Sequence, residues 1–274
     1  MRSSGERTEA IEKQLYLWCA RPRDLSAEGV AQKCELLLSE DERARWQRFR
    51  LCGNRNEYLL TRALARIALS EYHSLTPQAW RFQSNAFGKP STDPDCGLRF
   101  NLSNSLDLVV CLISKGAEVG VDVESCARAE EIAELAPDVF SPPELVQLEA
   151  LRGREKLDRA LSLWTLKEAF IKAVGMGLCL PMRQFSFLFG GAEGIRLELD
   201  PHLCGQPMRS WRFCLLNHAG HRIALMAETT AVPELQGWEA RPFLAPPSRL
   251  ADLEVQWFPV EPFPSEKSHP NQIH

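Results

Sequence analysis

Residues 118–124 read EVGVDVE, and this short stretch decides both the local structure and its chemistry. Side chains alternate across a β-strand with period two, so the three valines point to one face while Asp122 and Glu124 share the other. The valine face predicts a strand that packs on a hydrophobic core. Two carboxylates on one face repel each other unless a cation lies between them, and their hard oxygens suit Mg²⁺, which also binds substrate phosphates. The alternative is a half-exposed strand with an ordinary polar face, which the motif taken alone favours.

The elements on either side of this strand come twice in the same order. Before it, a helical stretch at residues 58–68 leads to a short strand at 80–83 and to an apolar run at 106–113, typical of a buried strand. After it, we expect a helix from about residue 157 to 173, ended near Gly175. Further strands are expected at residues 185–189, 195–199, 211–216 and 222–228. We therefore predict an α+β fold made of two similar halves with a cleft between them.

This repeat predicts three parts in the chain. Residues 1–115 form an N-terminal α+β half, and residues 116–230 form a C-terminal α+β half that carries the metal-site motifs. Residues 231–274 form a C-terminal extension with eight of the chain's eighteen prolines. Such a composition is typical of segments without regular structure, so we expect none there, although bulky residues near Trp238 and Phe243 suggest contact with the body.

Composition limits the class of protein. The 274 residues include 36 acidic and 32 basic side chains, for a net charge of −4, whereas a general nucleic-acid binder shows a basic excess. Seven arginines in residues 43–66 could attract an anion or could lie on a solvated helix face. Nine cysteines without C-x-x-C or zinc-ligand spacing indicate a reducing compartment. The polar N-terminus lacks a signal-peptide pattern, and no apolar run reaches the ~20 residues of a membrane span. We therefore predict a cytoplasmic protein that binds neither membrane nor nucleic acid.

The predicted long helix contains a second candidate motif, WTLKEAFIK at residues 164–172. Trp164, Glu168 and Lys172 lie at i, i+4 and i+8, along one stripe of the helix. Lys167 projects to a different side, about 100° around the axis. Glu168 is either a third carboxylate that faces the D-x-E strand, with lysines nearby to hold phosphate, or one member of a surface Glu–Lys pair. The helix taken alone favours the surface pair.

A small polar cluster, FNLSNS at residues 100–105, opens the apolar run of the first half. Its serine and asparagine side chains can donate hydrogen bonds to a phosphate or a base. They are equally typical of a turn, which is the default expectation for such residues. The turn Gly88-Lys89-Pro90 before the cluster offers one lysine in a rigid loop.

Together these pieces have a familiar order. They are FGKP at 87–90, FNLS at 100–103, VGVDVE at 119–124, FSPPEL at 140–145 and WTLKEAFIKAVGMGL at 164–178. Over roughly residues 36–190 the chain resembles the 4′-phosphopantetheinyl transferases of the surfactin-synthetase-activating (Sfp) type. The D-x-E and W-x-x-K-E-x-x-x-K motifs, about 40 residues apart, are highly specific as a pair. The resemblance therefore overrides the alternatives that each motif favours alone.

The resemblance implies two α+β halves related by a pseudo-twofold axis, with coenzyme A in the cleft. It implies a Mg²⁺-dependent enzyme that transfers 4′-phosphopantetheine from coenzyme A to a serine of an apo acyl, peptidyl or aryl carrier protein. The second product is 3′,5′-ADP. Fatty-acid, polyketide and nonribosomal peptide biosynthesis all use such carriers, and the sequence does not select among them. Because both halves belong to one chain, we expect a monomer.

The resemblance also assigns roles, residue by residue. Asp122, Glu124 and Glu168 match the metal ligands, and Glu168 also matches the general base. Lys172 matches the lysine that holds the pyrophosphate. Lys167 falls on a further motif position, and we expect it among the coenzyme A contacts.

The remaining matches lie on the binding side of the cleft. Arg45 and Lys89 match basic residues at the nucleotide end of coenzyme A, Ser103 matches a serine of the family's S-H motif, and Glu144 matches a position near the active site. Asn104 stands where the family has histidine. Asparagine donates a hydrogen bond but cannot become cationic, so we expect a weaker phosphate contact.

Two other functions are compatible with parts of this pattern. A coenzyme A-binding regulator without catalysis would account for Asn104 and for the long C-terminal extension. A different Mg²⁺-dependent enzyme, such as a nucleotide pyrophosphatase, would use the same carboxylates. The three retained carboxylates favour the transferase.

Overall fold

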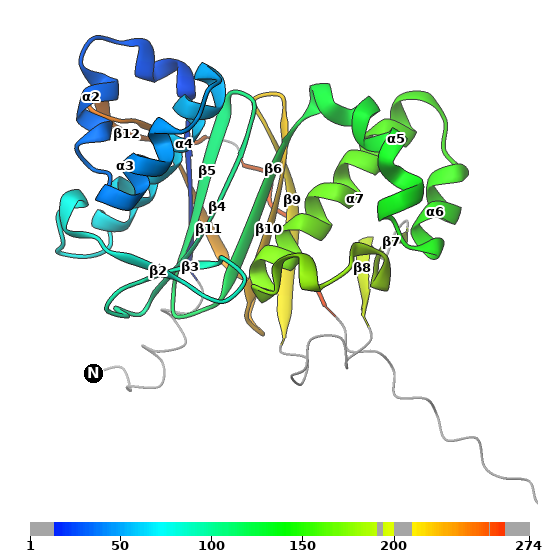
Figure 1. Cartoon of the computed structure of the whole chain (residues 1–274). Coiled ribbons are helices and arrows are strands. Elements are labelled where there is room, and N and C mark those ends of the chain that lie inside the picture. The colour runs from blue at the N-terminus through cyan, green and yellow to red at the C-terminus, as the bar shows by residue number, and fades with distance from the viewer. Residues whose placement is uncertain (1–13, 191–193, 200–209, 252, 261–274) are drawn as a thin grey trace, which may run out of the picture.

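The computed structural model describes residues 14–190, 194–199, 210–251 and 253–260. The two main sheets lie side by side in the middle of the molecule, and helices cover the two outer sides (Figure 1). One sheet has the strand order β12-β11-β1-β5-β4 and the other the order β13-β9-β10-β6. Alternate residues of both sheets meet in a shared apolar layer. The layers therefore run helix, sheet, sheet, helix.

The N-terminal half starts with a strand and a group of helices. Its elements are β1 (Gln14–Ala20), η1 (Pro22–Ser26), α2 (Val30–Glu35), α3 (Glu40–Gln47), α4 (Cys52–Ser70), η2 (Pro77–Ala79), β2 (Phe82–Ser84), β3 (Pro90–Thr92), β4 (Leu98–Ser105) and β5 (Leu108–Lys115). A capping box begins α3, since the Ser39 side chain accepts from the backbone N–H of Glu42 and the Glu42 side chain accepts from that of Ser39. The α4 helix packs its apolar face on the outer side of β1, β4 and β5.

The C-terminal half follows the same plan. Its elements are β6 (Val119–Ser125), η3 (Cys126–Arg128), α5 (Ala129–Val139), α6 (Pro142–Glu149), α7 (Gly153–Val174), η4 (Gly177–Cys179), η5 (Met182–Gln184), β7 (Phe185–Gly190), β8 (Gly194–Leu199), β9 (Trp211–His218) and β10 (His221–Glu228). The α7 helix ends at Gly175, whose φ of 73° is a left-handed conformation that favours glycine.

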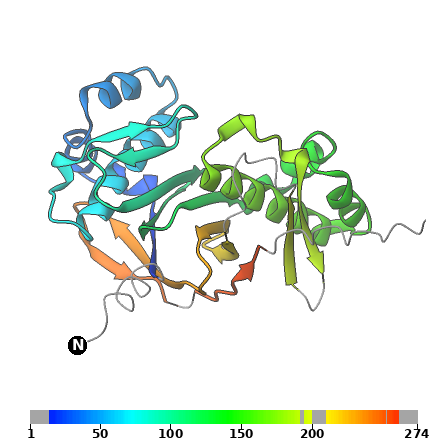
Figure 2. The same cartoon turned by 90° about the horizontal axis from the view of Figure 1, so that it is seen from below.

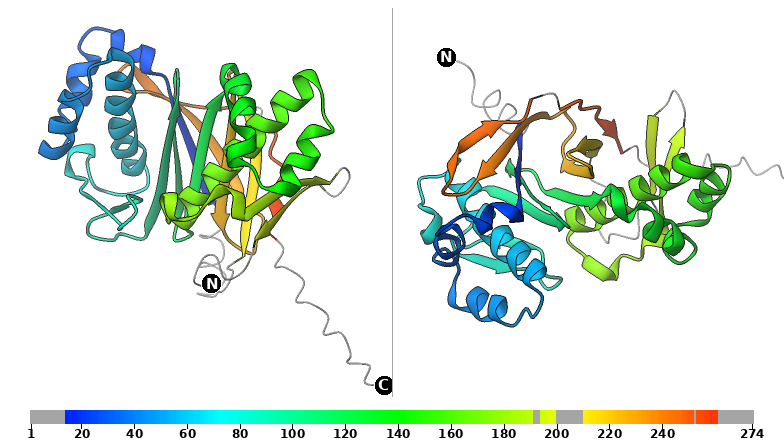
Figure 3. Two further views of the ribbon diagram at one scale, coloured as in Figure 1. Left: turned by 45° about the vertical axis from the view of Figure 1, so that its right-hand side comes forward. Right: turned by 90° about the horizontal axis from the view of Figure 1, so that it is seen from above.

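The two halves share one topology. The series β1, α4, β2–β3, β4–β5 corresponds to β6, α7, β7–β8, β9–β10, and the sheet orders β1-β5-β4 and β6-β10-β9 match, with antiparallel pairing throughout. The helices of the two halves lie at opposite ends of the molecule (Figure 3). The predicted α+β fold with two similar halves is confirmed.

Gly120 sets how closely α7 approaches β6. A Cβ atom on this glycine would lie 2.2 Å from the carbonyl oxygen of Ala169 and 2.5 Å from the nitrogen of Ala173. Only a residue without a side chain allows this contact. The D-x-E strand and the helix with the second motif are therefore in direct backbone contact.

The expectation that residues 231–274 lack regular structure is wrong for the described part. There β11 (Glu234–Arg241) pairs in parallel with β1, and β12 (Ala245–Arg249) pairs with β11, as the orange strands beside β1 show (Figure 2). A last short strand, β13 (Phe258–Pro259), pairs with β9. The β11 strand contains no proline, while Pro246 and Pro247 lie on the edge strand β12, where a missing N–H is tolerated. Residues 261–274 lie outside the described residues.

Residues 100–105 are a strand rather than a turn. They belong to β4, and the turn comes after them at Leu106, with a φ of 49°. No helix among the described residues has the length and apolar character to cross a membrane.

Candidate active site

A cleft of about 740 Å³ opens between the two halves. The N-terminal half contributes α4, the 87–90 turn and β4, and the C-terminal half contributes α5, α7 and the segment that follows α7. Trp164, Glu168 and Lys172 all line it, as the stripe on one helix face predicts. Asn104 lines it from the opposite side.

Polar side chains of β4 join the two sheets beneath this cleft. The β6 strand lies at the edge of its own sheet, and its N–H groups toward β4 need acceptors. Asn101, Ser103 and Ser105 supply them with side-chain oxygens. The donors are the backbone N–H groups of Val121, Val123 and Ser125, at 2.9, 3.3 and 3.1 Å. The cluster that suggested a turn is thus a ladder of side chains that fixes the D-x-E strand.

Asp122 is held from both halves. Its Oδ1 accepts from Lys172 Nζ at 2.6 Å and from Ser103 Oγ at 2.9 Å. Lys172 also donates to Ser103 Oγ at 2.9 Å. The other oxygen, Asp122 Oδ2, is buried and has no hydrogen-bond partner among the described residues. A buried acceptor without a donor is unfavourable, so this oxygen is suited to a cation.

Glu124 is more fully occupied. Its Oε1 accepts from Trp164 Nε1 at 3.0 Å, and its Oε2 accepts from Ser105 Oγ at 2.9 Å and from the Arg128 guanidinium at 2.6 Å. The side chain of Glu124 is therefore fixed in one position by residues of β4, α7 and η3.

Glu168 lines the cleft from α7. Burial raises the pKa of Glu168, and the charge of Asp122 adds to the rise, while Lys172 opposes it. Glu124 raises the pKa further. The three predicted ligands are thus close enough to interact through their charges. A carboxyl with a raised pKa beside other carboxylates is a typical functional-site feature.

In the described part of the chain, no three His, Cys, Asp or Glu side chains converge closely enough to hold a metal ion. Instead, Asp122 forms an ion pair with Lys172, and Glu124 forms one with Arg128. The donor set nevertheless fits a hard cation, because it consists of carboxylate oxygens and leaves Asp122 Oδ2 unpaired. The residues present therefore fit Mg²⁺ by their chemistry.

Lys167 does not face the cleft, which corrects its assignment as a coenzyme A contact. Its side chain is fully buried, and its ammonium bonds Glu144 at 2.8 Å and the carbonyls of Met182 and Phe185 at 2.7 and 2.5 Å. Burial lowers the pKa of Lys167 to about 8, and the Glu144 carboxylate opposes this shift. The rotation of about 100° from Glu168 turns Lys167 into the core, where it ties α7 to α6 and β7.

Of the two basic residues predicted to contact the nucleotide, Arg45 lies outside the cleft and Lys89 lines it. Arg45 is on α3, outside the cleft, with its guanidinium 5.6 Å from the ring centroid of Tyr58. Lys89 lines the cleft, but its ammonium bonds Glu118 at 2.6 Å. Asn104 donates to Glu57 at 2.9 Å.

Three further residues bear on the site and were not predicted. Asn101 and Ser105 repeat at period two around Ser103, which is the signal that could have revealed the side-chain ladder. Arg128 follows Glu124 by four residues but in a separate short helix, so spacing alone gives no indication of their contact.

Comparison with known proteins gives a consistent result. The 4′-phosphopantetheinyl transferase superfamily matches residues 118–226. The 4′-phosphopantetheinyl transferase HetI of Nostoc sp. is 31% identical over 194 residues, which are 70% of this chain and 81% of HetI. A 4′-phosphopantetheinyl transferase of Bacillus subtilis is 30% identical over 66% of this chain and 75% of its own length.

The enzyme Sfp of Bacillus subtilis strain 168 is 31% identical over 60% of this chain and 73% of Sfp. The matched segment of the superfamily includes β6 and α7, which carry both motifs. The length and identity of the match to HetI, together with the paired motifs, settle the classification: the chain belongs to the 4′-phosphopantetheinyl transferase superfamily.

Proposed function

We propose that this protein transfers 4′-phosphopantetheine from coenzyme A to a serine of an apo carrier protein. The observation that carries the proposal is the contact of Lys172 with Asp122 beside Glu168, on the wall of a cleft lined by both halves. Relatives of similar sequence bear the name of this activity. The division at residues 116 and 231, monomeric action and a cytoplasmic location are part of the same proposal.

In the proposed reaction the carrier serine oxygen attacks the β-phosphorus of coenzyme A. The bond from that phosphorus to the bridging oxygen breaks, and 3′,5′-ADP leaves with the electron pair. Serine is a weak nucleophile at neutral pH, so its proton must be taken up. Glu168 accepts it, directly or through water, and the raised pKa of Glu168 makes it a stronger base than an ordinary carboxylate.

The other residues bind and orient. Lys172 holds the pyrophosphate and stabilises the charge that develops there. Ser103 and Asn104 approach the same phosphates from β4, and Lys89 approaches the nucleotide end. Asp122, Glu124 and Glu168 would hold Mg²⁺, which when bound supplies neutralisation of the pyrophosphate charge.

The test is a panel of apo acyl, peptidyl and aryl carrier proteins incubated with coenzyme A and Mg²⁺. Mass spectrometry should show a gain of one phosphopantetheine group on at least one carrier. Glu168→Gln should abolish the gain while leaving the circular dichroism spectrum unchanged. Coenzyme A binding without modification of any carrier would identify a regulator instead. Nucleotide release without an acceptor would identify a pyrophosphatase.

A further inference from the structure

The turn between β2 and β3 crosses the boundary between the halves and bonds the C-terminal end of α7. Asn85 donates from Nδ2 to the carbonyl of Gly175 at 2.9 Å, and Lys89 donates from Nζ to the carbonyl of Ala173 at 2.7 Å. The last carbonyls of a helix have no partner within the helix, and a cation there is favoured by the helix dipole. Residues of one half thus cap the helix that carries Glu168 and Lys172 in the other.

Asn85 both shapes this turn and attaches it. Its Oδ1 accepts from the backbone N–H groups of Phe87 and Lys89, each at 2.9 Å. The remaining polar atom, Nδ2, is the one that reaches Gly175. All of the polar atoms of this side chain are therefore used in the turn or in the cap.

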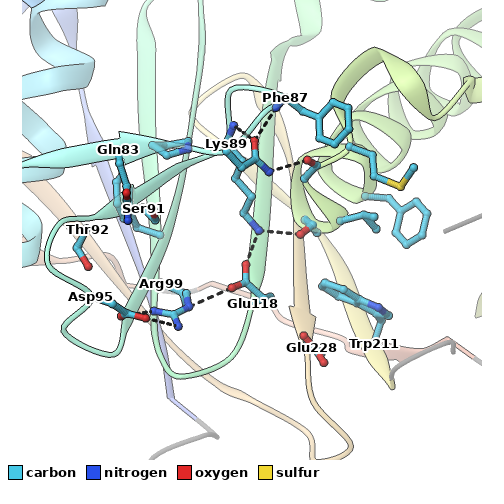
Figure 4. A pocket seen from close by; sticks show the side chains of 18 residues that line it. Gln83, Phe87, Lys89, Ser91, Thr92, Asp95, Arg99, Glu118, Trp211 and Glu228 are labelled. Atoms are coloured by element: carbon cyan, nitrogen blue, oxygen red, sulfur yellow. Dashed lines mark hydrogen bonds and ion pairs between the residues drawn. The ribbon is translucent and has the colours of Figure 1, made fainter. Parts of the chain in front are cut away.

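A chain of charges holds Lys89 in place. Glu118 accepts from Lys89 Nζ at 2.6 Å with one oxygen and from Arg99 Nε at 3.0 Å with the other. Arg99 in turn donates to both oxygens of Asp95, at 2.8 and 3.0 Å. Figure 4 shows Lys89 extended toward Glu118 along this row. Glu118 therefore aims the ammonium at the end of α7.

The helix end is built for this contact. A Cβ atom on Gly175 would lie 2.9 Å from Lys89 Cδ and 3.2 Å from Asn85 Nδ2. Glycine thus serves both the left-handed turn and the close approach of the other half. The contact separates the cleft from a second hollow of about 590 Å³, and Phe87, Lys89 and Gly175 line both cavities.

We propose that Asn85 and Glu118 are positioning residues, which together with Lys89 form a cap that prepares α7 for coenzyme A. The capped turn lies at the proposed nucleotide end of the cleft. On α7, Glu168 lies one to two turns before the cap, and Lys172 lies in the last turn beside it. A ligand binds more tightly to a site that is already ordered, because no free energy of binding is lost in ordering the site. Loss of the cap therefore weakens coenzyme A binding, while bound coenzyme A restores the geometry for the chemical step. This inference rests on the proposed function for the identity of its ligand.

Two variants remove the cap in different ways. Asn85→Asp retains the acceptor oxygen of the turn but replaces the donor to Gly175 with a negative charge, which the helix C-terminus disfavours. Glu118→Gln retains the shape of Glu118 but removes the charge that holds Lys89. The matched control is Glu198→Gln, because Glu198 pairs with Arg196 at 2.7 Å and its side chain is 33% exposed, against 34% for Glu118.

The experiment measures amide hydrogen exchange of residues 171–175, the dissociation constant for coenzyme A by calorimetry, and steady-state kinetics. In both variants we expect faster amide exchange at this helix end. We also expect the dissociation constant and the KM for coenzyme A to rise roughly tenfold, because losing one hydrogen bond to a charged group changes an equilibrium constant by about this factor. The kcat and the KM for the carrier should stay within about twofold of the wild-type values. Glu198→Gln should match the wild type throughout.

Unchanged exchange in both variants would refute the cap. Faster exchange with unchanged coenzyme A affinity would refute the positioning role and leave a purely structural contact. If the wild-type protein modifies no carrier, the proposed function fails, yet exchange and coenzyme A affinity still decide the inference.

Discussion

Lys172 reaches from α7 to Asp122 on β6, with 2.6 Å between Nζ and Oδ1. The second oxygen of Asp122 is buried without a partner among the described residues. One oxygen is thus held by a cation of the chain itself, and the other is left for a ligand. The close backbone contact at Gly120 makes this geometry possible, because it brings the helix within reach of the strand's polar face.

Replacing Asp122 should separate catalysis from folding. In Asp122→Asn the side chain keeps its shape but loses the charge that binds Lys172 and a cation. We expect kcat/KM to fall by about 10²–10³, the range seen when one preorganised electrostatic contact is removed. The affinity for Mn²⁺, measured by electron paramagnetic resonance, should fall as well. Asp107→Asn, at a side chain 59% exposed, is the control, and undiminished Mn²⁺ affinity in Asp122→Asn would contradict the metal assignment.

The buried pair of Lys167 and Glu144 should matter for stability rather than for substrate binding. Lys167→Met leaves the Glu144 carboxylate buried without its cation, which costs about 3–5 kcal/mol. Urea unfolding should show this loss. In the double variant with Glu144→Leu, most of the loss should be recovered, although the N–H of Phe187 then loses its 2.7 Å acceptor.

A different result would return Lys167 to the binding site. If Lys167→Met keeps the free energy of unfolding of the wild type but raises the KM for coenzyme A, its ammonium acts in the cleft and the buried position does not persist in solution.

The protein should lose stability at alkaline pH because of its buried thiols. Burial raises the pKa of Cys19 and Cys34 from 9.0 to about 12, and that of Cys111 and Cys214 is also raised. Between pH 9 and 12 the unfolded chain releases these protons while the folded chain retains them, so stability falls as pH rises. We expect the free energy of unfolding at pH 10 to be lower than at pH 8 by about 1 kcal/mol for each of these thiols.

Urea unfolding at pH 8 and pH 10, under reducing conditions, checks this slope. Cys111→Ala should make the slope shallower, whereas Cys52→Ser, which removes an exposed thiol, should leave it unchanged. An equal slope in Cys111→Ala and the wild type would show that other groups cause the alkaline loss.

Local periodicity predicts much of this site. The alternation in residues 118–124 places Asp122 and Glu124 on one face, and the i, i+4, i+8 spacing places Trp164, Glu168 and Lys172 along the cleft. Both patterns work because they lie within single elements, where side-chain direction follows from backbone geometry. Contacts between elements are different, since they depend on how distant segments pack.

The features that the sequence does not reveal depend on contacts between separate elements. The β11 strand forms because β1 offers it a parallel partner more than 200 residues away, and proline content in the flanking residues hides it. Ser103 reads as a turn residue until β6 provides the N–H group that it accepts from. Arg128 reaches Glu124 only because the chain turns into η3 after the strand.

Gly120 offers the sharpest test of how the fold positions the site. In Gly120→Ala the new methyl group would overlap the backbone of Ala169 and Ala173 on α7, and overpacking of this kind costs about 1–3 kcal/mol. Relief requires α7 to move away from β6, which would carry Lys172 and Glu168 away from Asp122. We therefore expect kcat to fall by more than tenfold even at temperatures where the variant is fully folded. Gly53→Ala, in the first turn of α4, is the matched control, because a Cβ atom there meets nothing within 4 Å outside its own stretch of helix, and alanine is a better helix former than glycine. Thermal melts and transfer assays on both variants separate the two effects, and wild-type kcat in Gly120→Ala would mean that the helix-to-strand distance does not control the chemistry.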